Sequence, residues 1–285
     1  KMSDNFSYPQ NFIKYLGTGG ARFCMMTQMR WTGGIWFSYG GLNGVIDPGP
    51  GSLHHVCCAS PELDPREIRA IILTHRHLDH STDINVIAEA MTAGGFEKRG
   101  KILLPQDAFA NKDSVLLDYC AKKVENVTAA HDGVTADLGN GVTAEPVLHI
   151  HHGVECYGMI MRKKGLPTWG VLSDTKPLDS FAERYAECDY ISINATFPDK
   201  KPRLEHMSMA DVGELLESLH PKLVTISHMG VILLELGPEK YAEMISTEQT
   251  KVIAGKDGMV VDIEKLDVYV PVESEKKDDE YYLVK

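Results

Sequence analysis

The sequence predicts a single α/β domain in which two β-sheets pack together inside helices. Extended segments separated by glycines occupy the first 50 residues, which is typical of antiparallel strands. From residue 69 onward, short apolar strands alternate with helical stretches. The chain has no internal repeat and no linker rich in proline or serine. We therefore expect one domain over residues 2–272, followed by a charged tail over residues 273–285 whose charge run at 273–280 is solvated and in part mobile.

The expected strands are short apolar or alternating runs that end at glycine or at polar turn residues. They cover residues 12–16, 22–31, 35–39, 42–46, 70–73, 102–104, 142–148, 157–161, 169–172, 190–193, 223–226 and 259–263. Apolar residues at helical spacing predict helices over 81–93, 108–123, 178–187, 210–220 and 239–248. The helix at 210–220 has the clearest start, because Ser208 and Asp211 have the spacing of a capping box.

The charge and composition exclude several classes of protein. The formal net charge is −11, from 29 Lys and Arg against 40 Asp and Glu, and it repels polyanions such as a long nucleic acid. No apolar run reaches the roughly 18 residues of a membrane helix, and the start of the chain is polar, unlike a secretion signal. The six cysteines contain no C-x-x-C pair, which favours reduced thiols. We expect a cytoplasmic protein with no membrane partner.

The segment Thr-His-Arg-His-Leu-Asp-His at positions 74–80 is the most informative part of the chain. It directly follows an apolar strand and offers four potential metal ligands: His75, His77, Asp79 and His80. Imidazole and carboxylate groups suit zinc, manganese, iron or nickel. At a strand end, residues 75 and 77 point to one side, and the following turn brings residues 79 and 80 toward a second ion. The segment therefore predicts a metal site.

A pair of ions needs more than four ligands, so other histidines and aspartates at strand ends are candidates. Asp174 and His228 each close an apolar strand, and His152 lies between two strands. His149 and His151 compete with His152, and spacing alone does not choose among these three histidines.

The chain resembles the metallo-β-lactamase superfamily, whose His-x-His-x-Asp-His motif is matched in full at positions 75–80. Within it, the chain is most similar to the branch of ribonuclease Z and the bacterial phosphonate-pathway cyclic phosphodiesterase. The shared segments are Leu-Gly-Thr-Gly at 16–19, His-Gly-Val-Glu-Cys-Tyr-Gly at 152–158, Ala-Thr-Phe at 195–197, and His206 before a helix. The resemblance spans most of the chain and implies a four-layer αββα sandwich, the metallo-β-lactamase fold.

The resemblance also implies how the ligands divide between two divalent ions. For the first ion it implies His75, His77 and His152, the last by its distance from Tyr157-Gly158. For the second ion it implies Asp79, His80 and His228, with Asp174 bridging both ions. Zinc is the expected metal, and manganese, iron and nickel are alternatives.

Residues outside the ligand set have expected roles as well. Asp47 ends an apolar strand, where its carboxylate could hold the second nitrogen of a ligand histidine. His206 lies beside the start of the helix at 210–220, where an anion is favoured. In ribonuclease Z-like proteins a histidine at this place contacts the scissile phosphate. The preceding loop, Lys200-Lys201-Pro202-Arg203, could attract the same anion.

Two departures from the ribonuclease Z pattern narrow the expected substrate. Asn194 stands where that family has glutamate, so a relay through His206 to a glutamate is incomplete. Only the short connection at 161–170 joins two strands where the nuclease has the arm that grips tRNA. We therefore expect small substrates, such as cyclic or short phosphodiesters, rather than tRNA.

These features predict a hydrolase with two metal ions, in first place a phosphodiesterase in which a metal-bridging hydroxide attacks phosphorus. Asp79 and Asp174 would orient the hydroxide, and His206 would steady negative charge or protonate the leaving oxygen. A lactone or thioester hydrolase and a non-catalytic metal-binding protein are the alternatives. The expected partner is a small anionic substrate. Apolar residues near the N-terminus are expected in the core or in a contact between two subunits, which leaves a homodimer open: Met25, Met26, Met29, Trp31, Trp36 and Phe37.

Overall fold

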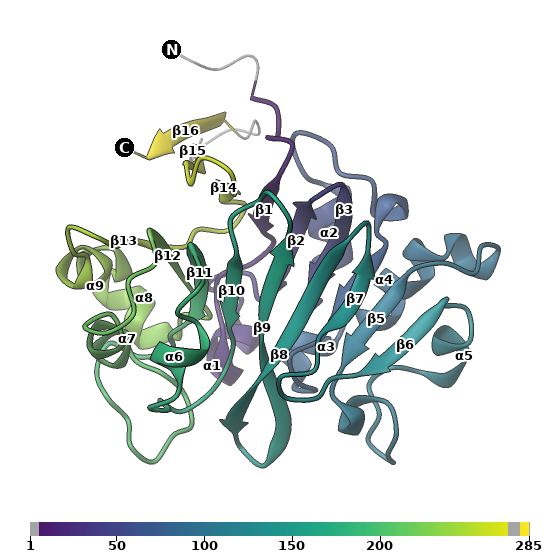
Figure 1. The fold of residues 1–285 in the computed structure, drawn as a ribbon, viewed down its shortest axis with the longest axis horizontal. Coiled ribbons are helices and arrows are strands. Elements are labelled where there is room, and N and C mark those ends of the chain that lie inside the picture. The colour runs from purple at the N-terminus through teal and green to yellow at the C-terminus, as the bar shows by residue number, and fades with distance from the viewer. Residues whose placement is uncertain (1–5, 273–279, 285) are drawn as a thin grey trace.

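The computed structural model describes residues 6–272 and 280–284. Two β-sheets lie face to face, and helices cover the outer face of each sheet (Figure 1). In spatial order, the first sheet contains β16 (Glu280–Val284), β15 (Val268–Val272), β14 (Val260–Asp262), β1 (Phe12–Tyr15), β2 (Ile35–Tyr39), β3 (Leu42–Ile46), β4 (Ala70–Ile72), β5 (Lys101–Leu104) and β6 (Asn126–Ala129). The second contains β13 (Lys251–Ala254), β12 (Leu223–Ser227), β11 (Tyr190–Asn194), β10 (Trp169–Leu172), β9 (Val154–Lys163), β8 (Val142–His151) and β7 (Ala136–Gly139).

The α-helices of the described residues are short. They are α1 (Ala21–Thr27), α2 (Ser52–Cys57), α3 (Leu78–Ser81), α4 (Ile84–Met91), α5 (Asp118–Ala121), α6 (Phe181–Arg184), α7 (Met209–Leu215), α8 (Val231–Leu236) and α9 (Pro238–Ile245). Figure 1 shows α2, α4 and α5 beside the first sheet and α6 to α9 beside the second. Among these residues, no helix is long and apolar enough to cross a membrane.

Three layers of buried apolar side chains hold the elements together. The middle layer fills the space between the sheets, where the rings of Phe37 and Trp169 meet edge to face with centroids 6.0 Å apart. A second layer packs the first sheet on α4 and includes Trp36, and a third packs the second sheet on α7 and includes Val212. Because successive strand residues point to opposite faces, the neighbours Trp36 and Phe37 enter different layers. The predicted four-layer αββα sandwich is confirmed.

The sequence prediction of a strand over residues 22–31 was wrong, because helix α1 includes residues 22–27 and residues 28–31 form neither a helix nor a strand. Cys24 is its only buried side chain among those described, whereas Phe23 and Met26 are exposed. The apolar residues therefore do not mark a strand in the core. Trp36 and Phe37 lie in the core as expected, while Met29 and Trp31 are also exposed.

The helix predicted over residues 108–123 is largely absent, since only α5 forms there after a 3-10 turn at Gln106–Ala108. Asn111 accepts a hydrogen bond from the Asp113 N–H through its side chain, and its carbonyl accepts one from the Ser114 hydroxyl. Such local bonds give the backbone an alternative to the helix. In contrast, helix α7 begins at the predicted capping box, in which Ser208 and Asp211 bond each other's backbone N–H.

Part of the predicted tail belongs to the first sheet. Residues 280–284 form β16, which pairs antiparallel with β15, so the first sheet extends into the predicted tail. The charged residues 273–279 lie outside the described residues.

The candidate site residues follow the carboxyl ends of parallel strands. The pairs β3–β4, β10–β11 and β11–β12 are all parallel. Asp47 follows β3 and His75 lies shortly after β4, while Asp174 follows β10 and His228 follows β12. The two sheets therefore bring the ends of these strands together at one end of the sandwich, where the turn between β8 and β9 also lies.

Candidate metal centre

The motif segment folds back at the end of β4, which brings its ring nitrogens together. His75 follows the strand closely, His77 precedes α3, and Asp79 and His80 lie within this helix. His75 Nε2 lies 3.1 Å from His77 Nδ1. The four donors thus divide into a pair at 75 and 77 and a pair at 79 and 80, as the sequence predicts.

The third histidine near the first pair is His151, not the predicted His152. His151 Nε2 lies 3.1 Å from His77 Nδ1, and potential ligand atoms of His75, His77 and His151 all lie within 4.8 Å of one another. The pleat of β8 explains the correction, because His149 and His151 occupy alternate positions on one face of the strand and are both buried. His152 lies in the turn that follows, with its side chain 38% exposed.

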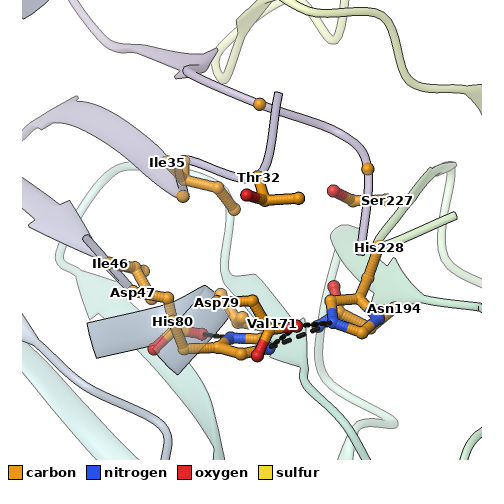
Figure 2. Close-up of a pocket in the computed structure, with 13 residues that line it drawn as sticks. Thr32, Ile35, Ile46, Asp47, Asp79, His80, Val171, Asn194, Ser227 and His228 are labelled. Carbon is orange, nitrogen blue, oxygen red and sulfur yellow. Dashed lines mark hydrogen bonds and ion pairs between the residues drawn. The ribbon is translucent and has the colours of Figure 1, made fainter. Parts of the chain in front are cut away.

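The second pair meets His228, which comes from the other sheet. His228 Nε2 lies 3.1 Å from His80 Nε2 and 3.2 Å from Asp79 Oδ2. Figure 2 shows His80 with one ring nitrogen directed at Asp47 and the other at the group formed by His228 and Asp79. The three residues form a second set of donors within 4.8 Å, which is the grouping that the resemblance implies.

Asp174 lies between the two sets of ligands. Its Oδ2 is 3.2 Å from His228 Nε2 and 3.6 Å from His151 Nε2. The same oxygen is 3.5 Å from His80 Nε2. Its Oδ1 accepts a hydrogen bond of 2.8 Å from the Asn194 side chain. Asp174 is buried in the position that a bridging carboxylate would occupy.

Hydrogen bonds on the outer side of the rings determine which nitrogens carry protons. His80 Nδ1 lies 2.9 Å from the Asp47 carboxylate, and His151 Nδ1 lies 2.7 Å from the Glu205 carbonyl oxygen. Both partners are acceptors, so both Nδ1 atoms donate a hydrogen bond and both Nε2 atoms face the cluster. His228 differs, because its Nε2, the atom that faces the cluster, accepts a hydrogen bond of 3.2 Å from the Ala21 N–H.

These residues fit a pair of divalent cations. Ring nitrogens and carboxylate oxygens converge at separations of about 3 Å, where their lone pairs repel each other unless a proton or a cation lies between them. Asp47 and the Glu205 carbonyl orient the rings in the way that is usual for metal-binding histidines. Asp47 therefore occupies the supporting position that the sequence predicts.

The pKa values agree with a cation site. Burial lowers the pKa of His75 well below its ordinary value and that of His77 to about 4, so both rings are neutral at pH 7. Burial alone would also lower the pKa of His80, but the carboxylates of Asp79 and Asp174 raise it well above its ordinary value. Burial would raise the pKa of Asp174, but His228 and His80 hold it well below the usual range. A cation that binds here displaces the proton of His80.

His206 lies next to this cluster. Its Nδ1 is 3.6 Å from Asp174 Oδ2 and 3.3 Å from the Thr196 hydroxyl oxygen, and its ring stacks on His228 at 5.6 Å between centroids. Burial lowers the pKa of His206 to about 3. Asn194, the departure from the ribonuclease Z pattern, holds Asp174 rather than His206.

The basic loop before His206 is only partly available to an anion. Lys200 Nζ lies 2.5 Å from Glu214 on α7, so this cation is already paired. Lys201 and Arg203 are exposed. The prediction of three available cations is thus reduced to two.

The glycines near the N-terminus let the backbone approach the cluster. A Cβ at Gly20 would lie 2.1 Å from the ring of His228, so only glycine fits there. A small cavity of about 40 Å³ borders the second ligand set and is lined by Asp79, His80 and His228 together with Gly17 and Gly19 (Figure 2).

The comparison of sequences identifies the family. A sequence model of the beta-lactamase superfamily domain matches residues 43–229, the range that holds all ligand candidates. The chain belongs to this superfamily. This beta-lactamase superfamily member is 29% identical over 258 residues to the uncharacterized protein MJ1374 of Methanocaldococcus jannaschii, a match that covers 88% of this chain and 94% of that protein.

Solved structures of two other proteins share the metallo-β-lactamase fold with this superfamily member. A diphosphatase from the PhnP family superposes with a TM-score of 0.63 at 20% identity, covering 88% of this chain and 96% of that one. The short form of human tRNase Z superposes with a TM-score of 0.65 at 16% identity, covering 88% of this chain and 99% of that one. The resemblance to this branch is confirmed at the level of the fold, and membership supports a hydrolase.

Sequence reasoning missed Glu205 and Thr196 as supports of the site. Glu205 holds His151 through its backbone carbonyl, and any residue type offers that group, so no sequence signal marks it. The Thr196 hydroxyl lies 3.1 Å from His228 Nδ1. A signal for Thr196 was present, because it belongs to the Ala-Thr-Phe segment shared with the ribonuclease Z branch.

Proposed function

We propose that the protein is a phosphodiesterase that holds two zinc ions and acts on small or cyclic phosphodiesters. The observation that carries this proposal is the position of Asp174, whose Oδ2 lies within 3.6 Å of ring nitrogens from both ligand sets. His75, His77 and His151 would hold the first ion, and Asp79, His80 and His228 the second. Nitrogen and oxygen donors of this kind suit zinc, with manganese, iron and nickel as alternatives.

The bound ions would lower the pKa of a water molecule and polarise the bond to be cleaved. The chain's own residues would hold this arrangement in place. Asp174 is fixed through Oδ1 by Asn194, which leaves Oδ2 directed at both ligand sets. His206, backed by Thr196, would bind the negative charge that develops on the phosphoryl oxygens or on the leaving oxygen.

Two features support a small anionic substrate. The connection between β9 and β10 is confined to residues 164–168, so no arm extends there to grip a long nucleic acid. Lys201 and Arg203 lie exposed in the loop before His206 and would attract an anion, whereas the net charge of −11 would repel a polyanion. The similarity in fold to a PhnP-family diphosphatase is consistent with chemistry at phosphorus.

The test combines elemental analysis of the purified protein with parallel hydrolysis assays. We expect about two zinc ions per chain and turnover of bis(p-nitrophenyl) phosphate and of 2′,3′-cyclic nucleotides. Turnover confined to a panel of lactones and thioesters would assign the same site to carbonyl substrates. Two bound ions without turnover of any ester would favour a non-catalytic metal-binding protein.

A further inference from the structure

The turn between β8 and β9 has an unfavourable residue at its first position. His152 and Gly153 both have a left-handed backbone, with φ of 44° and 71°, and they join the paired residues His151 and Val154. Glycine or asparagine normally occupies the first position of such a two-residue turn. A histidine there is strained, and strained residues cluster at functional sites.

Two other hairpins of this chain show what the turn prefers. Gly40-Gly41 joins β2 to β3, and Asn140-Gly141 joins β7 to β8, each with positive φ at both residues. These turns use the residue types that tolerate this backbone. Turn geometry therefore gives no reason for a histidine at position 152, and its side chain must supply the reason.

The imidazole of His152 lies at the outer edge of the metal centre. Its ring centroid is 4.4 Å from that of His151 and 5.3 Å from that of His206. The side chain of His152 is 38% exposed, against 12% for His206 and 1% for His151. An incoming substrate would therefore meet His152 before it meets the buried ligands.

The spacing of His152 and His206 suits a shared anionic oxygen. Nitrogen atoms of His151, His152 and His206 lie within 4.8 Å of one another. Two N–H donors that each bond one oxygen at about 2.9 Å, at a tetrahedral angle, lie about 4.7 Å apart. The pair can thus bind one oxygen of a phosphoryl group from two sides.

Glu205 connects His152 and His206. Its carboxylate accepts a hydrogen bond from the backbone N–H of His152, and its Oε2 lies 4.0 Å from His152 Nδ1. Its own carbonyl oxygen accepts the hydrogen bond from His151 Nδ1. Because Glu205 directly precedes His206, it holds the turn and His206 at a fixed separation.

We propose that His152 is a substrate-binding residue that clamps an anionic oxygen of the substrate together with His206, and that Glu205 is the positioning residue of this clamp. The inference deepens the proposed function and rests on it for the identity of the reaction, because the clamp itself requires only an anionic oxygen at the metal centre.

The decisive variant is His152→Gly, which removes the imidazole and suits the left-handed backbone. In the zinc-loaded protein we expect two zinc ions, a melting temperature raised by about 2 °C and binding of phenylphosphonate weakened about tenfold by calorimetry. KM for bis(p-nitrophenyl) phosphate should rise by a similar factor. Asn140→Gly is the matched control, because it places glycine in the same kind of turn away from the site, and it should leave phenylphosphonate binding unchanged.

Glu205 is tested by a pair of variants. Glu205→Gln keeps an oxygen acceptor for the His152 N–H and should bind phenylphosphonate within about twofold of the unmodified protein. Glu205→Ala removes that acceptor and should weaken phenylphosphonate binding severalfold while both zinc ions remain.

Two outcomes would overturn the clamp, and a third would overturn the proposed reaction alone. Loss of a zinc ion from His152→Gly would make His152 a metal ligand, and unchanged phenylphosphonate affinity would remove it from anion binding; either result overturns the clamp. If the zinc-loaded protein cleaves no phosphodiester but His152→Gly still weakens phenylphosphonate binding, the proposed reaction fails and the clamp stands.

Discussion

The two halves of the metal centre are built in different ways. One half comes from a single segment, in which His75, His77, Asp79 and His80 lie within six residues at the end of β4. The other half comes from the ends of three strands in the second sheet: His151 of β8, Asp174 after β10 and His228 after β12. The first half depends on local backbone geometry, whereas the second depends on the order of the strands. Local sequence is therefore a reliable guide to the first half only.

The largest effect is expected at Asp174, because its Oδ2 lies within 3.6 Å of ring nitrogens from both ligand sets. In Asp174→Ala we expect loss of at least one zinc ion and a fall in kcat/KM on the order of a thousandfold or more. Elemental analysis and hydrolysis of bis(p-nitrophenyl) phosphate measure both effects. Asn194→Ala, which removes only the hydrogen bond to Asp174 Oδ1, is the control and should keep both ions. A variant at Asp174 with full zinc content would show that the two ligand sets bind zinc without this carboxylate.

A variant at His151 tests whether this residue is a ligand of the first ion, an assignment that the sequence did not make. Removing it in His151→Ala takes a ligand from the first ion, so we expect about one zinc ion per chain and a fall of about a hundredfold in kcat/KM. His149→Ala removes the neighbouring buried histidine on the same face of the strand. The structure places this histidine against Tyr185 instead of the cluster, so the variant should keep both ions. Equal zinc loss in both variants would point to disruption of β8 rather than loss of a ligand.

The supporting residues of the two halves differ in charge, and this difference predicts unequal effects. Asp47 presents a buried carboxylate to His80, whereas Thr196 presents a hydroxyl to His228. We expect Asp47→Ala to weaken zinc binding by about 10- to 100-fold and Thr196→Ala by less. Competition with a fluorescent zinc chelator measures both affinities. Because Asp47 also accepts two hydrogen bonds from Thr74, the melting temperature of each variant serves as the control for folding.

The same contrast explains how much of the site could be predicted from the sequence. The motif at positions 75–80 predicts its half of the centre because donor type and spacing are both local. Asp174 and His228 were predicted from their positions at strand ends, and the structure brings both to the cluster because parallel strands of one sheet end at the same edge. The choice between His151 and His152 failed, because it depends on where β8 stops and its turn begins, and a shift of one residue reverses the direction of the side chain. The two-residue turn His152-Gly153 fixes where β8 ends, and this places His151 rather than His152 in the cluster.

The predictions for residues 22–31 and 108–123 failed for a different reason. Residues 22–31 are rich in apolar side chains, but Phe23 and Met26 are exposed, so apolar content did not report on burial there. In residues 108–123, side chains such as that of Asn111 bond the nearby backbone in competition with a helix. Both failures lie on the surface, where packing places few constraints on the sequence.

The smallest expected effect concerns the buried histidines of the metal-free protein. Burial lowers the pKa of His149 to about 3, against about 6.5 in an unfolded chain. A histidine with a lowered pKa is neutral in the fold, so its contribution to stability is present above pH 6.5 and is lost as the pH falls from 6.5 toward 3. We expect the free energy of unfolding of the chelator-treated protein to fall between pH 7 and pH 5, with His149 accounting for about 2 kcal/mol of the change. In His149→Gln, which keeps a polar group opposite Tyr185, urea denaturation should show a correspondingly smaller fall over this range. An identical pH dependence in the two proteins would assign the loss to the candidate ligand histidines instead of His149, so that the same residues would govern acid stability and metal binding.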